Sequence, residues 1–230
     1  SPVVFTNGKI IQGPEVSDHA VALLLVLARS LHYLLRGKGP QPMPRPLELR
    51  DKTALVFGTG GIGVLLAEKL KALGMRVIAV DDDYLPMVSF IDEFYLTEKL
   101  MEHLPRAFAV LCCCPNTERS RFVFSEHAFR AMGKDAFFIN VSRGRLVQTD
   151  ALVKVLQEGH LKGVGLDVTD PEPLPESHPL RAIDRVVITP HMAGPSDQNR
   201  RRSFELIKDN IARFLEGRPL INVVDKSRGY

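Results

Sequence analysis

The sequence predicts an α/β fold in which a parallel sheet is covered by helices on both faces, a doubly wound arrangement. Short apolar segments of strand length alternate with helical patterns from residue 53 onward. A glycine-rich loop, Gly58–Gly63, joins the first of these strands to its helix. Over 230 residues, 45% are apolar and 25% charged, which is typical of a globular chain of one large domain or one and a half.

Charge and cysteine usage exclude several classes of protein. The 30 Lys and Arg against 27 Asp and Glu leave a net charge of +3, too balanced for a dedicated nucleic-acid binder. The longest apolar run, Ala20–Ala28, is much shorter than the roughly 20 residues of a membrane span, and we expect no signal peptide at the start. Three adjacent cysteines, Cys112–Cys114, form neither a disulfide framework nor a spaced metal site, so we expect a cytoplasmic protein without a metal.

The first 50 residues lack the regular alternation. A short strand is predicted at Val3–Thr6, and a long helix at about Pro14–Leu35. The middle of this helix is apolar on every face, which predicts burial both against its own domain and against a partner subunit. The segment Gly37–Arg50 holds four Pro and two Gly and is predicted to be a linker or surface excursion.

The alternation then runs to the end of the chain. Predicted strands are Thr53–Phe57, Arg76–Val80, Phe108–Cys112, Ala136–Val141, Gly163–Val168 and Val186–Ile188. Predicted helices are Gly61–Leu73, Thr97–Leu104, Ser125–Met132, Thr149–Glu158 and Ser196–Glu216. In the last helix, Phe204, Ile207, Ile211 and Phe214 form one apolar stripe, and Arg200–Arg202 are expected on a solvated face.

The loop Gly58–Gly63 has the spacing G-x-G-x-x-G, and it follows an apolar strand and opens a helix. In this context the pattern predicts a dinucleotide site. Gly58 permits the tight turn, Gly60 lets the backbone approach a pyrophosphate, and Gly63 lets the helix pack close to the strand. The helix N-terminus offers N–H groups and partial positive charge to the phosphates.

Asp81 ends the next predicted strand and is expected to accept hydrogen bonds from the adenosine ribose hydroxyls. A 2′-phosphate at that place would meet Asp81, Asp82 and Asp83, with no Lys or Arg among them. Like charges repel, so we expect NAD(H) to be preferred over NADP(H). The alternative is a glycine-rich turn beside acidic surface residues.

Four more candidates follow later strands, where an open sheet presents its ligand site. When a hydride leaves a carbinol carbon, the hydroxyl proton must leave as well. His191 is suited to take that proton, because imidazole titrates near neutrality. Glu172 is the candidate carboxylate that orients the ring and favours imidazolium. Arg143 offers a planar fork to a substrate carboxylate. Taken one at a time, each of these residues also has a structural interpretation. His191 could be structural, Arg143 and Glu172 could be solvated surface charges, and Asp167 could brace a loop.

These motifs together resemble the D-isomer-specific 2-hydroxyacid dehydrogenases. The resemblance covers about Val4–Tyr230, and its specific parts are Gly58–Gly63, Asn140–Gly144 with Leu146 and Val147, Gly163–Pro173 and Thr189–Gly194. It implies a Rossmann-type cofactor domain with NAD(H) as cofactor. It also implies a small 2-hydroxy or 2-oxo acid substrate, with glyoxylate and hydroxypyruvate as the best candidates.

The resemblance implies a role for each motif residue. Arg143 would hold the substrate carboxylate and carbonyl, and Glu172 and His191 would form the acid–base pair. Asp167 would contact the nicotinamide amide, and Ile62 would place its N–H at the pyrophosphate. The expected cofactor-binding residues are Gly58, Thr59, Gly60, Gly61, Ile62, Gly63, Asp81, Pro115, Thr117, Val141, Asp167 and Gly194.

The sequence departs from the family at its start. Relatives carry a further N-terminal stretch that builds most of a substrate domain, and this chain begins at Ser1 without it. We therefore interpret residues 1–195 as the NAD-binding domain and 196–230 as a helix and tail that return to the missing domain. We expect NAD(H) binding to persist, with turnover lost or weak. The helix Val16–Leu35 corresponds to the family's dimerisation region, so a homodimer is expected.

Two alternatives share this fold. An NAD(H)-sensing interaction protein of the C-terminal-binding corepressor type has the same catalytic residues without a metabolic role, and its peptide-binding surface lies largely in the absent part. A formate dehydrogenase is disfavoured because its catalytic His is typically paired with Gln, whereas this chain has Glu172.

Overall fold

A single parallel sheet of seven strands forms the centre of the computed structural model, which describes residues 3–9, 11–37, 44–83 and 88–227. The strand order is β3-β2-β1-β4-β5-β6-β7, and every neighbouring pair is parallel. The strands are β1 Thr53–Phe57, β2 Arg76–Asp81, β3 Glu93–Leu96, β4 Ala109–Cys112, β5 Phe137–Asn140, β6 Gly163–Leu166 and β7 Val186–Ile188. The chain reverses its direction of winding between β3 and β4, which brings the carboxyl ends of β1 and β4 together as a ligand crevice.

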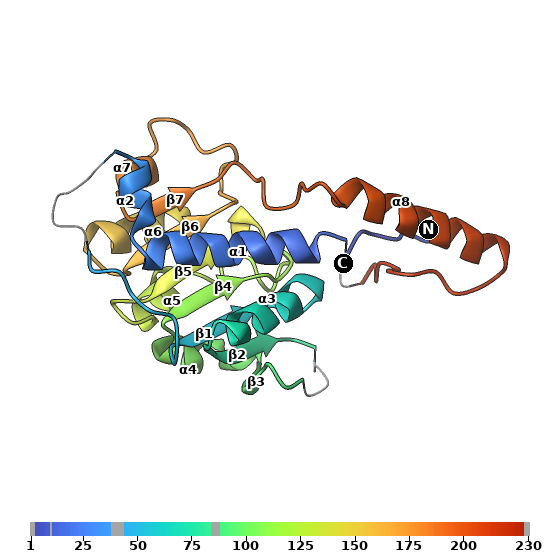
Figure 1. Cartoon of the computed structure of the whole chain (residues 1–230), viewed down its shortest axis with the longest axis horizontal. Coiled ribbons are helices and arrows are strands. Elements are labelled where there is room, and N and C mark those ends of the chain that lie inside the picture. Colours follow the sequence, from blue (N-terminus) through green and yellow to red (C-terminus); the bar gives the residue numbers. More distant parts are fainter. Residues whose placement is uncertain (1–2, 10, 38–43, 84–87, 228–230) are drawn as a thin grey trace.

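Helices cover both faces of the sheet (Figure 1). The helices are α1 Gly13–Ala28, α2 Leu31–Leu35, α3 Gly61–Ala72, α4 Leu100–His103, α5 Glu126–Ala131, α6 Thr149–Gln157, α7 Pro179–Ala182 and α8 Asn199–Leu215. Alternate residues of each strand point to opposite faces. Accordingly, Ala54 and Val56 pack in the cluster that contains α1 and α3, whereas Leu55 and Phe57 pack in the cluster that contains α5 and α6.

The predicted α/β class is confirmed, and so is each strand predicted from Thr53 onward, with small shifts at the ends. Two elements were not predicted. β3 extends the sheet beyond β2, and it is less buried than the central strands: Glu93, Phe94 and Tyr95 are partly buried and Leu96 is exposed. α7 is a single turn within the proline-rich loop.

The predicted N-terminal strand is wrong as a sheet element. Thr6 forms only an isolated antiparallel bridge with Val223, beside a hydrogen bond from Asn7 N to Asn222 O of 3.0 Å. The first and last segments therefore run side by side. Pairs so distant in the sequence leave no local pattern that predicts them.

The predicted helix Pro14–Leu35 is broken in two. Ser30 has a left-handed backbone with φ of 57°, which ends α1 at Ala28 and starts α2 at Leu31. Leu24 is fully buried in this chain's own core, whereas Ala22 is exposed and Leu25 is partly buried, so this chain covers only one face of the apolar middle. Leu24 therefore belongs to the core of the domain rather than to a subunit interface.

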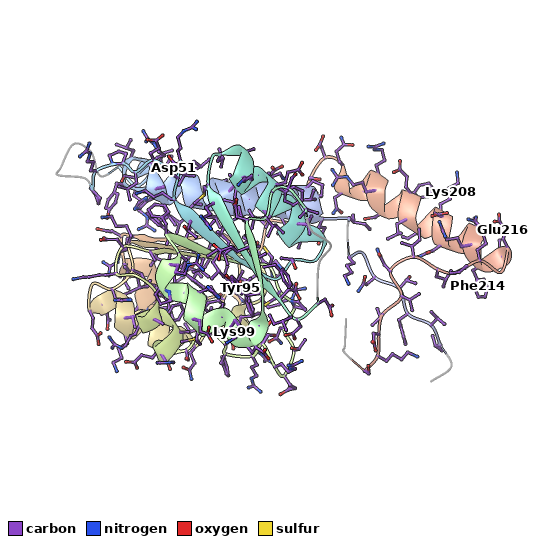
Figure 2. All side chains as sticks on the ribbon, turned by 90° about the horizontal axis from the view of Figure 1, so that it is seen from below. Asp51, Tyr95, Lys99, Lys208, Phe214 and Glu216 are labelled. Carbon is purple, nitrogen blue, oxygen red and sulfur yellow. The ribbon has the colours of Figure 1, made fainter. Side chains whose placement is uncertain are left out.

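The last helix, α8, extends away from the sheet (Figure 1). None of its residues is buried, and Figure 2 shows Phe214 at its far end. Gly217 follows the helix with φ of 69°, the left-handed backbone that glycine commonly supplies at a helix end. In the segment Gly37–Arg50, residues 38–43 lie outside the described residues, as do 228–230 of the tail. No helix of the described part is long and apolar enough to cross a membrane.

Candidate active site

The loop Gly58–Gly63 joins β1 to α3 at the carboxyl edge of the sheet. A Cβ on Gly63 would lie 1.9 Å from Gly58 O, so only glycine allows this approach of helix and strand. Gly58 has φ of 95°, a backbone that side chains disfavour. Nothing lies within 4 Å of the place where a Cβ on Gly60 would project. That open space, beside the first-turn amides of α3, fits the pyrophosphate expected there.

Asp81 ends β2 and points at this loop. Its Oδ2 accepts hydrogen bonds from Thr59 N at 2.5 Å and from Thr59 Oγ1 at 2.9 Å. Its Oδ1 accepts one from Asp83 N at 3.2 Å. Asp81 thus holds the glycine loop in place, and its Oδ1 retains room for a further donor such as a ribose hydroxyl.

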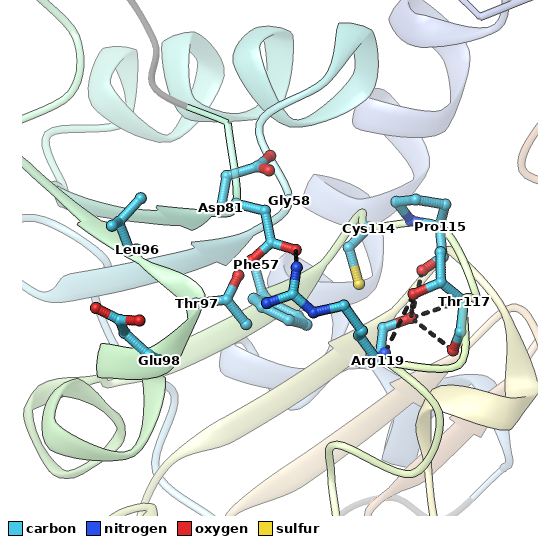
Figure 3. Close-up of a pocket in the computed structure, with 12 residues that line it drawn as sticks. Phe57, Gly58, Asp81, Leu96, Thr97, Glu98, Cys114, Pro115, Thr117 and Arg119 are labelled. Atoms are coloured by element: carbon cyan, nitrogen blue, oxygen red, sulfur yellow. Dashed lines mark hydrogen bonds and ion pairs between the residues drawn. The ribbon is translucent and has the colours of Figure 1, made fainter. Parts of the chain in front are cut away.

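A cavity of about 340 Å³ opens where β1, β2 and β4 end (Figure 3). Gly58 and Asp81 line one part of it, and Pro115 and Thr117 of the loop after β4 line another. Ser120 Oγ bonds Pro115 O at 2.7 Å and accepts from Thr117 N at 2.8 Å, so this loop is held in shape. The structure therefore brings four of the expected cofactor-binding residues to one cavity.

His191 and Glu172 form a pair at the same edge of the sheet. His191 Nδ1 lies 2.5 Å from Glu172 Oε1, and both side chains are partly exposed. His191 has φ of 52°, uncommon for a residue with a side chain, and such conformations cluster at functional sites. The hydrogen bond at Nδ1 leaves Nε2 as the ring nitrogen that can face a substrate.

Asp167 follows β6 and supports the loop of His191. Its buried carboxylate accepts hydrogen bonds from Thr189 Oγ1 at 2.6 Å, Met192 N at 2.9 Å and Ala193 N at 3.0 Å. His191 N donates to Asp167 O at 2.8 Å. These contacts agree with the loop-bracing interpretation, and contact with a nicotinamide stays a prediction.

Arg143 follows β5, the strand beside β6. Its Nη1 donates to Ser142 O at 2.7 Å and, in the part of the chain that the structure describes, it is not bonded to His191 or Glu172. The loop is shaped by buried Asn140, whose side chain accepts from Ser142 N at 3.0 Å and donates to Arg143 O at 2.9 Å. The guanidinium is exposed and remains available to an anion.

The remaining expected residues frame these loops. Val141 is buried directly after β5. Gly194 lies beside α1, because a Cβ there would meet Gln12 Nε2 at 2.7 Å. Gly61 and Ile62 begin α3. Val141, Gly61 and Ile62 therefore lie at strand or helix ends, and Gly194 lies in the loop between β7 and α8.

Of the three cysteines, Cys112 and Cys114 are buried and Cys113 is partly buried. Cys112 and Cys114 pack in one core cluster and Cys113 against the other, as strand alternation predicts. Burial raises the pKa of Cys113 to about 12 and raises those of Cys112 and Cys114 well above the ordinary value. Protonated thiols react slowly, so the apolar interpretation is favoured over redox sensing. No cluster suited to a metal ion occurs among the described residues.

Two residues of the site were missed from the sequence. His19 of α1 lies 2.9 Å from Thr189 Oγ1 and 3.4 Å from Asp167 Oδ1, so the N-terminal helix also supports the His191 loop. Arg119 lines the cavity and pairs with Asp82 at 3.4 Å. His19 directly precedes the apolar run Ala20–Ala28, a sequence signal that could have found it, whereas no local pattern distinguishes Arg119 in its polar loop.

Comparison with known proteins agrees with this geometry. Residues 21–193 match the family model described as D-isomer specific 2-hydroxyacid dehydrogenase, NAD binding domain. An uncharacterized protein of Corynebacterium melassecola is 39% identical over 78% of this chain and 59% of its own length. A glyoxylate reductase of Korarchaeum cryptofilum is 31% identical over 97% of this chain and 70% of its own length.

A solved D-isomer specific 2-hydroxyacid dehydrogenase from Xanthobacter autotrophicus, in complex with NADPH and MES, has a TM-score of 0.88. It is 28% identical, and the match covers 100% of this chain and 95% of that one. The seven-stranded parallel sheet and the glycine loop together define a Rossmann-like nucleotide-binding domain. The chain belongs to the D-isomer specific 2-hydroxyacid dehydrogenase family and spans 59% of the first curated relative named above.

Proposed function

We propose that this chain is the cofactor-binding part of a dehydrogenase that transfers a hydride between NAD(H) and a small 2-hydroxy or 2-oxo acid. The observation that supports this proposal most strongly is the pair of His191 and Glu172. His191 Nδ1 lies 2.5 Å from Glu172 Oε1, at the sheet edge that also bears the glycine loop. An acid–base pair beside a nucleotide site suits reduction of a carbonyl, which needs both a proton and a hydride. The glyoxylate reductase among the relatives favours glyoxylate or hydroxypyruvate as substrate.

We propose a role for each of three side chains. Arg143, exposed after β5, binds the substrate carboxylate through its planar fork. His191 Nε2–H donates a proton to the carbonyl oxygen, while Glu172 at Nδ1 stabilises the imidazolium from which that proton comes. NADH, when bound, supplies the hydride to the carbonyl carbon. The sum is 2-oxo acid, NADH and H⁺ giving 2-hydroxy acid and NAD⁺.

We propose that NAD(H) is preferred over NADP(H). The end of β2 carries three successive carboxylates, Asp81, Asp82 and Asp83, and a 2′-phosphate beside them meets repulsion. The related structure from Xanthobacter autotrophicus holds NADPH, so both forms need to be measured.

We propose further that the protein acts as a cytoplasmic homodimer. Leu31, Leu34 and Leu35 of α2 are 42%, 51% and 79% exposed and extend the dimerisation region predicted from the sequence. Leu35→Asp should then yield monomer by light scattering with an unchanged melting temperature. If the Leu35→Asp variant still has the mass of a dimer, the interface lies elsewhere.

The first test is a fluorescence titration of the purified chain with NADH and NADPH, followed by NADH oxidation at 340 nm with glyoxylate and hydroxypyruvate. We expect NADH to bind more tightly than NADPH. In a version with its substrate domain, His191→Asn should abolish most turnover while NADH affinity stays within about twofold.

His178→Asn is the matched control, because His178 caps the short helix α7 through Leu180 N at 3.3 Å rather than pairing with Glu172. It should leave turnover unchanged. A folded chain that binds neither nucleotide refutes the proposal, and so does normal turnover of His191→Asn.

A further inference from the structure

Arg119 lines the same cavity as Asp81, the residue expected to bind the adenosine ribose. Figure 3 shows its side chain reaching from the loop after β4 across the cavity lined by Gly58 and Asp81. Its Nη1 pairs with Asp82 Oδ2 at 3.4 Å, and its side chain is 84% exposed. The ion pair thus joins the loop after β4 to the end of β2 at the mouth of the cavity.

The charged side chains that line this cavity are mostly negative. Its lining residues include three carboxylates, Asp81, Asp82 and Glu98, and one cation, Arg119. Residues 81–92 contain no Lys or Arg, so the segment after β2 cannot supply a second one. Arg119 is therefore the cation that this loop cluster offers to an anionic group on the ribose.

Asp81 and Asp82 differ in their partners. The Asp81 carboxylate is held by Thr59 N and Thr59 Oγ1 of the glycine loop. Asp82 contacts Arg119 through one ion pair of 3.4 Å. Because a guanidinium has five N–H donors, this contact leaves donors of Arg119 for a second acceptor. A phosphate can replace Asp82 on Arg119, because an exposed carboxylate pair of this kind is weak and a phosphate accepts a bidentate bond.

From this arrangement, and resting on the nucleotide site of the proposed function, we propose that Arg119 is a specificity-determining residue for the cofactor. Its guanidinium binds the 2′-phosphate of NADP(H), and Asp82 competes for it. The pair sets how strongly the pocket rejects the phosphorylated cofactor. NAD(H), which has only a hydroxyl at that position, does not need Arg119.

The test uses two nucleotides that differ only by the 2′-phosphate, adenosine 5′-monophosphate and adenosine 2′,5′-bisphosphate, titrated by calorimetry beside NADH. Arg119→Ala should weaken the bisphosphate about tenfold and the monophosphate by less than twofold, as expected for loss of one partly exposed charge contact. Asp82→Asn should strengthen the bisphosphate about tenfold. In the double variant most of that gain should vanish, because the guanidinium for which Asp82 and the phosphate compete is gone.

Arg121→Ala is the matched control in the same loop. Arg121 lies over the Phe122 ring at 5.0 Å and is not among the residues that line the cavity, so both nucleotides should bind as to the unchanged chain. Equal weakening of both nucleotides by Arg119→Ala places Arg119 on the shared 5′-phosphate and overturns the inference, as does no change in either. If the unchanged chain binds neither NADH nor the monophosphate, the proposed function itself falls and this inference with it.

Discussion

At the scale of single residues, the nucleotide loop depends on an atomic contact that tolerates no side chain. The Cα of Gly63 lies so close to Gly58 O that a methyl group would be 1.9 Å from the oxygen. The same loop is held by Thr59, which donates two hydrogen bonds to Asp81. The glycines and the Asp81 carboxylate therefore fix both the shape of the loop and the position of α3 against β1.

Gly63→Ala should damage both stability and cofactor binding. The added methyl forces α3 away from β1, which we expect to cost about 2–4 kcal/mol of unfolding free energy and to weaken NADH at least tenfold. Urea denaturation and NADH titration measure the two effects. Gly60→Ala is the informative comparison, because its methyl enters open space: it should weaken NADH while leaving the urea midpoint nearly unchanged.

Glu172→Gln should separate orientation from charge in the acid–base pair. An amide can still hydrogen-bond His191 Nδ1 but cannot stabilise imidazolium, so kcat should fall about 10²–10⁴-fold with NADH affinity preserved. Steady-state kinetics on a version with its substrate domain measure this. Glu176→Gln, in the same loop and pairing with Arg181 at 3.7 Å, should behave like the unchanged protein. Equal kcat for Glu172→Gln and wild type would remove Glu172 from the mechanism.

At the scale of elements, the edge strand β3 is held by ion pairs as well as by the packing of Tyr95 on the core. Arg106 donates to both carboxylate oxygens of Glu93 at 2.9 and 2.6 Å, and Tyr95 Oη donates at 2.6 Å. Arg76 of β2 adds bonds of 3.1 and 2.8 Å. These contacts fasten β3 to β2 and to the turn Leu104–Arg106.

Glu93→Gln should therefore destabilise the protein in a pH-dependent way. The Arg106 guanidinium, with the Tyr95 hydroxyl, lowers the pKa of Glu93 from 4.5 to about 2. A depressed pKa stabilises the fold above the unfolded value of about 4.5, and this contribution is lost as pH falls towards 2. We expect a loss of about 1–2 kcal/mol at pH 7, allowing for partly exposed partners, and a smaller one at pH 3.

Urea midpoints of both proteins at pH 7 and pH 3 measure this difference. Glu205→Gln is the control, since its partner Arg201 lies at 3.4 Å on an exposed helix face. Its midpoint should match the wild type at both pH values. A Glu93→Gln difference that is the same at pH 7 and pH 3 would contradict the account.

At the scale of the whole molecule, a well-packed sheet domain carries a long helix that buries nothing. Phe204, Ile207, Ile211 and Phe214 form the predicted stripe, and each is more than half exposed. Arg202 joins α8 to the domain through Glu15 Oε2 at 2.6 Å and Ile11 O at 3.0 Å. We propose that residues 196–230 return to the substrate domain, whose contact would cover this stripe.

Removing the stripe should change association without changing the domain. An exposed apolar patch promotes self-association, so replacing Phe204, Ile207, Ile211 and Phe214 together by Ser should lower the apparent mass of this chain at high concentration. Light scattering measures that mass. NADH affinity and melting temperature should stay unchanged, because none of the four residues belongs to the core. A mass identical to that of the unchanged chain would show that the stripe drives no association.

Local patterns in the sequence determined the order of the main strands and helices, the glycine loop, and the identity of His191, Glu172 and Arg143 as candidates. Strand burial and glycine spacing are local properties, so they could be predicted. The break at Ser30, the edge strand β3 and the Thr6–Val223 bridge depend on packing or on ion pairs between distant residues, so they could not. Only the tertiary structure decided that Leu24 is core, that Asp167 braces the His191 loop, and that Arg119 meets Asp82 across the nucleotide cavity, because each depends on which strand ends lie side by side.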